Sequence, residues 1–481
     1  MASVNSLPSE VLCIVFEYLS VDDLVHTIPS ICQKWKNASQ DILLWKNKTY
    51  RPTKDKTVED VVSYLKKLPR LYLLDLKSMT DENYVLVDKI LILICQMFPE
   101  VESVLLGDGA LYSVEQMISL LHVSSSLNSL SLNVSENNHD LMRALWSAPK
   151  LKHLSLTNHP ILDDISAEYI CNIVRCCHSL EALKLTVCVN DMNKITRILE
   201  VAKHVLKYLE FKAVFGFQQA LLSDSFVQCY KLKTLKFSTK EGQCELLNLA
   251  NFGKMPSILE LALINFPLVP SSLTLLFVQN SWPQLEVLCV SGVKTLETEF
   301  LHQVFERCPN LQSLDVSRSN ISDTGISSLN VHCPKLQHLC VSYTSLTDLS
   351  LTDFWRCPLV DTLILRACCK LTSNVVHHIV KCVHLKLIDA SNNTWLTDRD
   401  VVKLLSCSKL ETLRIGSCES ISGIFFQNVK CFSPTLREIE LSQFVHEDYY
   451  KITCQKLHSL RVTTVDKYSE YRLSNDVFAY P

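Results

Sequence analysis

Glycine is scarce in this chain, which has nine glycines among 481 residues. Phosphate-binding loops and dinucleotide folds depend on clustered glycines, and the sequence contains no Walker loop and no dinucleotide fingerprint. It also contains no nucleophile elbow and no His-Glu-x-x-His motif. The most apolar run, residues 90–98, is far too short to span a bilayer. These absences argue against a nucleotide-dependent enzyme, the common hydrolases and a membrane protein.

An excess of one charge is missing as well. The chain has 47 Lys and Arg against 50 Asp and Glu, a formal net charge of -3. This balance, with no run of stacked aromatic residues, gives no reason to expect nucleic acid or an anionic membrane as a partner. Glu10 and Glu17 interrupt the apolar residues at the N-terminus, and no basic segment precedes them, so no signal peptide is predicted. We expect a cytoplasmic or nuclear protein.

Paired cysteine spacings are absent although the chain has 21 cysteines. Most of the cysteines recur at fixed positions of a repeat, which predicts buried free thiols in a reducing compartment. Cys171, Cys176, Cys177 and His178 resemble a metal cluster on paper. Their position in the repeat nevertheless matches that of the cysteines that precede a strand in other repeats. This favours structural thiols over zinc ligands. We therefore predict no metal site and no cofactor.

The abundant feature is a repeat of about two dozen residues. Residues 308–341 hold one unit and the start of the next. Leu314 and Val316 alternate with small or charged residues, which is the period of a strand with one buried face. Ser322 and Asp323 are suited to cap the helical segment that follows. One unit cannot bury its apolar face alone, so the units are expected to stack.

The L-x-x-L-x-L pattern resembles the cysteine-containing subtype of leucine-rich repeats, which implies a curved parallel sheet on the concave side and helices on the convex side. In the second half a cysteine lies three residues before the first apolar strand position: Cys308, Cys333, Cys357, Cys382 and Cys407. About sixteen units are predicted. Their motifs start at Leu71, Val101, Leu127, Leu151, Leu180, Leu206, Leu232, Ile258, Leu285, Leu311, Leu336, Val360, Leu385, Leu410, Leu436 and Leu457.

The first fifty residues do not follow the repeat. Leu12, Val15, Phe16 and Leu19 fall at i, i+3, i+4 and i+7, one stripe of a helix. Two further short helices and a final apolar group are expected before Tyr50. About fifty residues can form only a small hydrophobic core of their own. The large apolar side chains are therefore expected either to complete a small bundle or to pack on a partner.

This segment resembles an F-box. The residues that match its pattern are Leu7, Pro8, Glu10, Leu12, Phe16, Leu19, Asp23, Leu24, Cys32, Trp35 and Trp45. The interval from Asp23 to Trp35 is one residue longer than usual, and Pro29 within it is predicted to end the second helix and shift its register. An N-terminal helical cap on the solenoid is the alternative interpretation.

The resemblance implies docking onto a Skp adaptor and, through it, onto a cullin scaffold. The residues assigned to the adaptor face are Leu7, Pro8, Leu12, Val15, Phe16 and Leu19. A second group is divided between that face and the helical core: Leu24, Ile31, Trp35, Leu44 and Trp45. The sequence alone does not divide this second group.

The predicted fold class is α/β, a small helical F-box followed by a leucine-rich-repeat solenoid. The domains are the F-box at 1–50, a polar linker at 51–70, the solenoid at 71–463 and a tail at 464–481. The tail is interpreted first as an end cap. A segment folded over the concave face and a disordered segment are the alternatives for it.

Residues between the last two apolar positions of each strand are expected to face a partner on the concave side. In the C-terminal half this column contains Asp389, Arg414, Glu440 and Arg461, with Arg366 one step along its strand. Earlier units place Lys184, Lys212 and Lys236 on the same face, next to Glu210. Both sets are candidate substrate-binding residues. A self-neutralised surface network is the competing interpretation, since exposed pairs contribute about 0–1 kcal/mol each.

These features together predict the substrate-recognition subunit of a Skp-cullin-F-box ubiquitin ligase, without catalytic residues of its own. Its mechanism would be effective concentration of a bound protein substrate near the ligase. The alternatives are a repeat scaffold without a ligase role, and a receptor that encloses a small molecule or inositol phosphate. A thiol enzyme would require an exposed cysteine of lowered pKa.

Overall fold

The computed structural model describes most of the chain. The described residues are 7–53, 56–107, 110–134, 139–159, 164–187, 192–213, 228–239, 255, 257–265, 276–277, 282–293, 296, 298–431, 434–442, 445 and 461–465. Contacts divide the chain into two units. Unit 1 comprises Met1–Phe217 with Gln228–Leu232, and unit 2 comprises Gln218–Val227 with Lys233–Pro481.

Unit 1 begins with a bundle of short helices. They are α1 (Ser9–Phe16), the π-helical segment η2 (Asp23–Thr27), α2 (Ile28–Ile31), α3 (Gln33–Ser39) and α4 (Ile42–Trp45). Leu12, Phe16 and Leu24 are each 1% exposed, and the Phe16 ring meets the edge of Trp35 at 5.4 Å between centroids. The indole Nε1 of Trp45 donates to the Ser39 carbonyl oxygen at 2.6 Å. These buried apolar residues therefore complete a core of their own.

The second helix differs from the prediction. The π-helical segment η2 runs directly into α2, and Pro29 lies in the first turn of α2. A π turn accommodates one additional residue, and a proline in a first turn lacks only an N–H group that has no helical partner there. The helix ends later, before Cys32, whose backbone is extended. The prediction that Pro29 ends this helix is wrong, and the longer Asp23–Trp35 interval is absorbed by the π turn.

Within the described part of unit 1, seven strands pair in parallel. They are β1 (Thr49–Tyr50), β2 (Leu73–Leu76), β3 (Ser103–Leu106), β4 (Ser129–Asn133), β5 (His153–His159), β6 (Ala182–Val187) and β7 (Tyr208–Ala213), paired in this order. The helices of the repeats are α5 (Val58–Leu65), α6 (Tyr84–Met97), α7 (Val114–Val123), α8 (His139–Ala144), α9 (Asp164–Cys176) and α10 (Met192–Ala202), with the 3-10 segments η3 (Asp81–Asn83) and η4 (Leu145–Ser147). Because Thr49 pairs with Leu73, the F-box segment contributes the first strand of the sheet.

Unit 2 continues the same pattern of parallel strands. They are β8 (Thr234–Thr239), β9 (Glu260–Ile264), β10 (Val287–Cys289), β11 (Ser313–Asp315), β12 (His338–Cys340), β13 (Thr362–Ile364), β14 (Leu387–Asp389), β15 (Thr412–Arg414), β16 (Glu438–Ser442) and β17 (Arg461–Val465). Helical segments follow the strands: α13 (Thr298–Arg307), α14 (Asp323–Ser327), α15 (Leu329–His332), η6 (Asp348–Leu351), η7 (Phe354–Arg356), η8 (Ser373–Val375), α16 (Val376–Ile379), α17 (Asp398–Leu404) and η9 (Ile424–Cys431).

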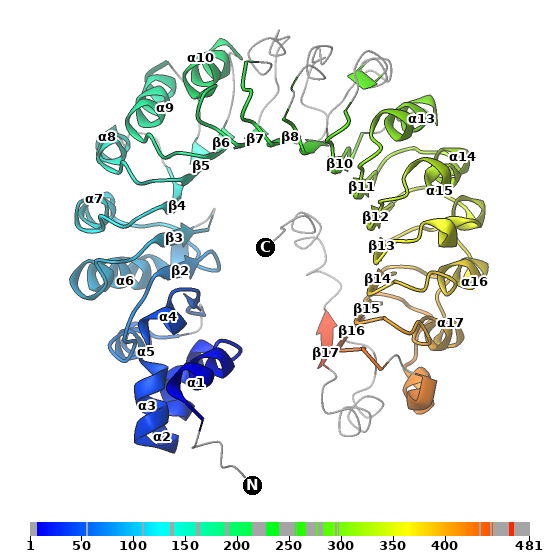
Figure 1. Ribbon diagram of the computed structural model, residues 1–481, viewed down its shortest axis with the longest axis horizontal. Helices are drawn as coiled ribbons and strands as arrows, with labels where there is room; N and C mark the ends of the chain where they lie inside the picture. Colours follow the sequence, from blue (N-terminus) through cyan, green and yellow to red (C-terminus); the bar gives the residue numbers. More distant parts are fainter. Residues whose placement is uncertain are drawn as a thin grey trace. The chain divides into compact units, whose positions relative to one another are not determined.

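Within each unit the strands line one face and the helical segments cover the other (Figure 1). Every predicted motif start from Leu71 to Leu436 lies two residues before an observed strand. The second leucine of each motif is buried between sheet and helices; Leu314, Leu339 and Leu363 are each 0% exposed. The structure therefore confirms the predicted fold class, a helical N-terminal segment followed by a leucine-rich-repeat solenoid.

The strand of the last predicted repeat, β17, is out of register with the sequence prediction. In β17, Val462 pairs with Ile439 and Arg461 pairs with Glu438, whereas the predicted motif would have placed Val462 opposite Leu441. The shift is two residues, which preserves the alternation of faces but moves Arg461 along the sheet. The predicted start at Leu457 and the tail at 464–481 fall almost wholly outside the described residues.

Aspartates link neighbouring repeats on the helical side of the sheet. The Asp323 carboxylate accepts from the backbone N–H and the hydroxyl of Thr347 at 2.8 and 2.7 Å. Asp348 holds Thr372 in the same way, at 2.8 and 2.5 Å. Both threonines are N-caps of the helical segments that follow them. Each aspartate therefore fixes where the next helical segment begins.

We expect Asp348→Ala to lower the free energy of unfolding by about 2 kcal/mol, because it removes two hydrogen bonds to a charged group. Urea unfolding followed by circular dichroism measures the change. Asp353→Ala is the matched control, since Asp353 is 3.4 Å from Arg356 of its own segment and both side chains are about half exposed. The control is expected to change stability by less than about 0.5 kcal/mol. Equal effects of the two substitutions would contradict the linking role.

Candidate functional site

Helix α1 has two apolar stripes. Leu12 and Phe16 face the core of the helical bundle. A second stripe is exposed: Val11, Ile14 and Val15 of the helix and Tyr18 just beyond its end, at i, i+3, i+4 and i+7, with exposures of 38%, 58%, 49% and 85%. Exposed apolar side chains at helical spacing indicate a surface that contacts another protein.

Further exposed apolar residues lie in the same bundle. Ile31 at the end of α2 is 48% exposed, and Ile42 and Leu43 in the first turn of α4 are 51% and 74% exposed. Helix α4 packs on α1. We define the F-box surface by these side chains: Val11, Ile14, Val15, Tyr18, Ile31, Ile42 and Leu43.

Polar contacts hold this surface in place. The Asp41 carboxylate caps α4 by accepting from the Leu43 backbone N–H at 2.8 Å. The Lys48 ammonium donates to the carbonyl oxygens of Glu17 and Leu19 at 2.7 and 2.6 Å, at the end of α1. A cation at this end of a helix is favourable, because the last carbonyls have no helical partner. Partial burial of Lys48 lowers its pKa from the ordinary value.

The structure divides the residues that the sequence assigned to the adaptor face. Five lie in the bundle core and are at most 2% exposed: Leu12, Phe16, Leu24, Leu44 and Trp45. Leu7, Leu19 and Trp35 are partly buried, whereas Pro8, Val15 and Ile31 are exposed. Assigning Leu12 and Phe16 to the face is therefore a misplacement, because neither side chain is accessible. The sequence interpretation missed Val11, Ile14, Tyr18, Ile42 and Leu43, although the first three follow helical period with Val15.

The strand face of unit 2 carries the predicted column of side chains. Strand pairing places Asp389 opposite Ile364 and Arg414, and Arg414 opposite Glu440, as the sequence predicts. Arg461 does not belong to this column, because it lies opposite Glu438 while Thr463 lies opposite Glu440. The predicted ladder of alternating charges therefore ends at Glu440.

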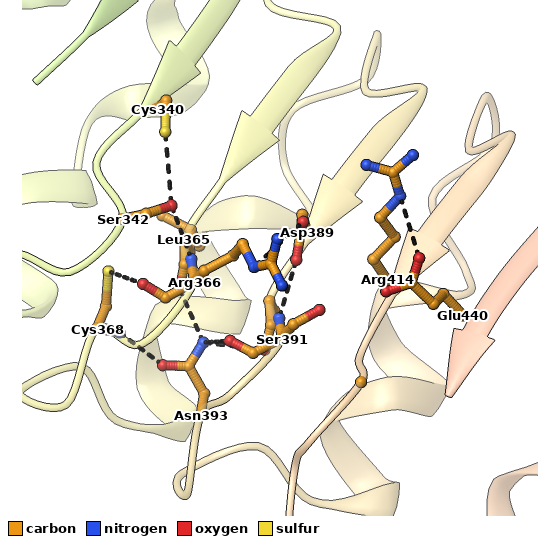
Figure 2. Close-up of polar contacts among 12 residues, drawn as sticks. Cys340, Ser342, Leu365, Arg366, Cys368, Asp389, Ser391, Asn393, Arg414 and Glu440 are labelled. Carbon is orange, nitrogen blue, oxygen red and sulfur yellow. Dashed lines mark hydrogen bonds and ion pairs between the residues drawn. The ribbon is translucent and has the colours of Figure 1, made fainter. Parts of the chain in front are cut away.

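The charged groups of this column pair with one another (Figure 2). The Arg366 Nε lies 3.8 Å from the Asp389 carboxylate, and both residues are buried, at 6% and 1% exposure. The Arg414 Nε lies 3.7 Å from Glu440, with the two side chains 35% and 15% exposed. We call Arg366, Asp389, Arg414 and Glu440 the strand-face cluster. Its pairing supports a network that neutralises itself, and a role of these residues in substrate binding stays a prediction.

Backbone contacts fix the strand-face cluster. The Asp389 carboxylate accepts from the Ser391 N–H at 3.1 Å, and the Arg366 N–H donates to the Ser342 hydroxyl at 3.1 Å. Asn393 donates to the Leu365 carbonyl oxygen at 2.8 Å (Figure 2). The Arg366–Ser342 and Asn393–Leu365 hydrogen bonds join neighbouring repeats through side chains as well as through the sheet.

A buried carboxyl group lies three strands away. Asp315 pairs with Cys289 and Cys340 on its two neighbouring strands, and the Cys289 thiol donates to its carboxylate at 3.4 Å. Burial raises the pKa of the Asp315 carboxyl, and hydrogen bonds from Ser317 oppose that rise. Within the described part of the chain no ion pair reaches this carboxyl group, and the Ser317 N–H donates to it at 2.8 Å.

The predicted lysines are partly neutralised. Lys184 on β6 lies 3.0 Å from Glu210 on the next strand of unit 1. Lys236 on β8 lies 2.6 Å from Glu260 on the next strand of unit 2. Lys212 is exposed. Two of the three lysines thus have carboxylate partners of their own, and their role in substrate binding also stays a prediction.

The repeat cysteines are buried free thiols. Cys308 and Cys333 are 0% exposed, and burial raises the pKa of Cys333 to about 12 and that of Cys407 to about 11. Protonated thiols are poor nucleophiles and poor metal ligands. Among the described residues no group of His, Cys, Asp and Glu is arranged to hold a metal ion, and Cys171 and Cys177 are buried free thiols. No helix in the described ranges has the length and apolarity needed to cross a membrane.

One family model matches the N-terminal part of the chain. Residues 4–51 match the family model described as F-box-like. No curated protein matches the chain. Solved structures that resemble it include the Rad7 and Elc1 complex in yeast, at 13% identity and a TM-score of 0.47, covering 98% of this chain and 100% of that one. A leucine-rich-repeat protein of Leptospira interrogans matches at 15% identity and a TM-score of 0.37, covering 82% and 99%. Both of these similarities are distant.

Proposed function

We propose that this chain, an F-box-like protein with leucine-rich repeats, is the substrate-receptor subunit of a Skp-cullin-F-box ubiquitin ligase. The observation that carries the proposal is the F-box surface, seven large apolar side chains left exposed on a bundle whose own core is already complete. Such side chains are costly to leave in water unless a partner covers them. The F-box surface is where the Skp adaptor docks, and the cullin joins through the adaptor.

The repeats hold the protein substrate in this proposal. In leucine-rich repeats each repeat contributes the outward side chains of one strand to a continuous surface. Such a surface suits recognition of an extended protein surface. Binding at one end and ligase attachment at the other raise the effective concentration of target lysines near the ubiquitin donor. In this proposal the chain itself performs no chemistry. We place this activity in the cytoplasm or nucleus.

A pull-down tests the docking assignment. The full chain and a chain that starts at Thr49 are captured on beads and probed for the Skp adaptor and cullin. Starting at Thr49 retains β1 and its pairing with β2, so the edge of the sheet stays intact. We expect only the full chain to capture both proteins, because the shorter chain lacks the F-box surface.

Each other outcome has a definite meaning. Capture of the adaptor by both chains would show that the docking surface lies outside the helical bundle. Capture by neither, with both chains folded, would leave a repeat scaffold without a ligase role. Capture of the adaptor without cullin, or without ubiquitylation in a reconstituted reaction, would contradict the ligase assignment while retaining the adaptor contact.

A further inference from the structure

A cavity of about 510 Å³ lies where the F-box helices meet the first repeat. Its walls come from η2, from β1 and the residues after it, and from α5, all in unit 1. A cavity of this volume is in the range of small-molecule sites. Its lining residues belong neither to the F-box surface nor to the strand-face cluster. We call it the junction pocket.

One wall of the junction pocket is aromatic. The rings of Tyr50 and Tyr64 stack at 5.0 Å with 13° between their planes, and the His26 ring tilts against Tyr64 at 5.6 Å. Burial raises the pKa of Tyr50 to about 12 and also raises that of Tyr64. Both phenols are therefore uncharged at neutral pH, and with the buried Val61 they form a neutral, mostly apolar wall.

The two carboxylates of the pocket are already engaged. The Tyr64 hydroxyl donates to the Asp22 carboxylate at 2.6 Å. The Thr57 hydroxyl donates to the Asp60 carboxylate at 2.7 Å, as part of the cap of α5. These hydrogen bonds occupy acceptor sites that a ligand donor would otherwise use.

The basic groups are less engaged. The Arg51 Nε is fixed by the Asp75 carboxylate at 2.7 Å, while the Arg51 side chain remains 71% exposed. The side chains of Lys56 and His26 are exposed, and within the described part of the chain neither side chain forms a hydrogen bond or an ion pair. The pocket has as many carboxylates, Asp22 and Asp60, as full cations, Arg51 and Lys56, but both carboxylates already accept hydrogen bonds. The remaining side-chain donors lie beside an aromatic wall, which suits an anion attached to a ring.

We propose that the junction pocket binds an aryl phosphate, with the phosphate between His26, Arg51 and Lys56 and the ring against Tyr50 and Tyr64. The ligand would contact the F-box helices and the first helix of the repeats together. Such binding stabilises the junction, because a ligand that binds only the folded form raises its stability. The proposal stands apart from the ligase assignment, since it rests on the pocket alone.

The test is calorimetric titration of the full chain with phenyl phosphate, with inorganic phosphate as a second probe. We expect a single saturable site for phenyl phosphate and binding at least about tenfold weaker for inorganic phosphate, which lacks the ring. In the double variant His26→Ala, Lys56→Ala, affinity for phenyl phosphate is expected to fall about tenfold or more. Lys67→Ala, an exposed lysine just beyond α5 and outside the pocket, is the matched control and keeps full affinity. Thermal unfolding of each variant confirms that it is folded.

Absence of binding at about 10 mM phenyl phosphate, where even millimolar affinity is detectable, overturns the proposal. Undiminished affinity of the double variant overturns it equally, as does equal affinity for inorganic phosphate. A short phosphotyrosine peptide identifies the source of the ring. Binding as tight as that of phenyl phosphate indicates a phosphorylated protein segment, and exclusion of the peptide indicates a free small molecule.

Discussion

The double substitution Ile14→Glu, Leu43→Glu is expected to weaken capture of the Skp adaptor by the full chain at least about 100-fold, or about 3 kcal/mol. The two side chains are 58% and 74% exposed, so glutamate is tolerated in the free protein. Against an adaptor each carboxylate would lose water without gaining a partner, which is costly. Titration of the purified adaptor onto immobilised chain measures the change.

Ile165→Glu is the control for this experiment. Ile165 lies in α9 of the repeats and is 55% exposed, so it is close to Ile14 in chemistry and accessibility but far from it along the chain. This variant is expected to bind the adaptor as the unmodified chain does. Thermal unfolding of the double variant must stay within a few degrees of the original for the result to count. Full adaptor affinity in a folded double variant would falsify the assignment of the F-box surface.

The sequence predicts the existence of this site better than its face. The chain is apolar around most of α1, since Val11, Ile14 and Val15 lie beside Leu12 and Phe16. Both stripes obey the helical period, and periodicity alone does not say which one packs on the neighbouring helices. Packing of α3 and α4 against α1 determines which stripe is buried, because these helices cover Leu12 and Phe16. The sequence of α1 alone does not specify this tertiary packing.

The strands of the repeats are a contrasting case. Each motif fixes its own strand, because leucines three and then two residues apart are compatible with only one phase of the sheet. The register prediction is wrong for the final repeat. Leu457, Leu460 and Val462 match the motif, yet Val462 pairs two residues away from its expected partner. The two-residue strand β1 was not predicted, because two residues carry no period.

Loss of the buried cation of the strand-face cluster is the second prediction. We expect Arg366→Met to lower the free energy of unfolding by about 3–5 kcal/mol, because it leaves the Asp389 carboxylate, 1% exposed, without its charge partner. Methionine fills a similar volume, so the effect reports charge rather than a cavity. Urea unfolding of the full chain, followed by circular dichroism, gives the difference.

Two comparisons isolate the charge effect. Arg414→Met removes a cation of the same cluster that is 35% exposed, and it is expected to cost no more than about 1 kcal/mol, because solvent screens its pair with Glu440. In the double variant Arg366→Met, Asp389→Leu both charges are gone, and most of the lost stability is expected to return. If the double variant is as unstable as Arg366→Met, the loss comes from packing and the ion pair is not its cause. If stability returns while substrate capture does not, the pair is needed for recognition and can be separated from folding, because the fold tolerates its replacement.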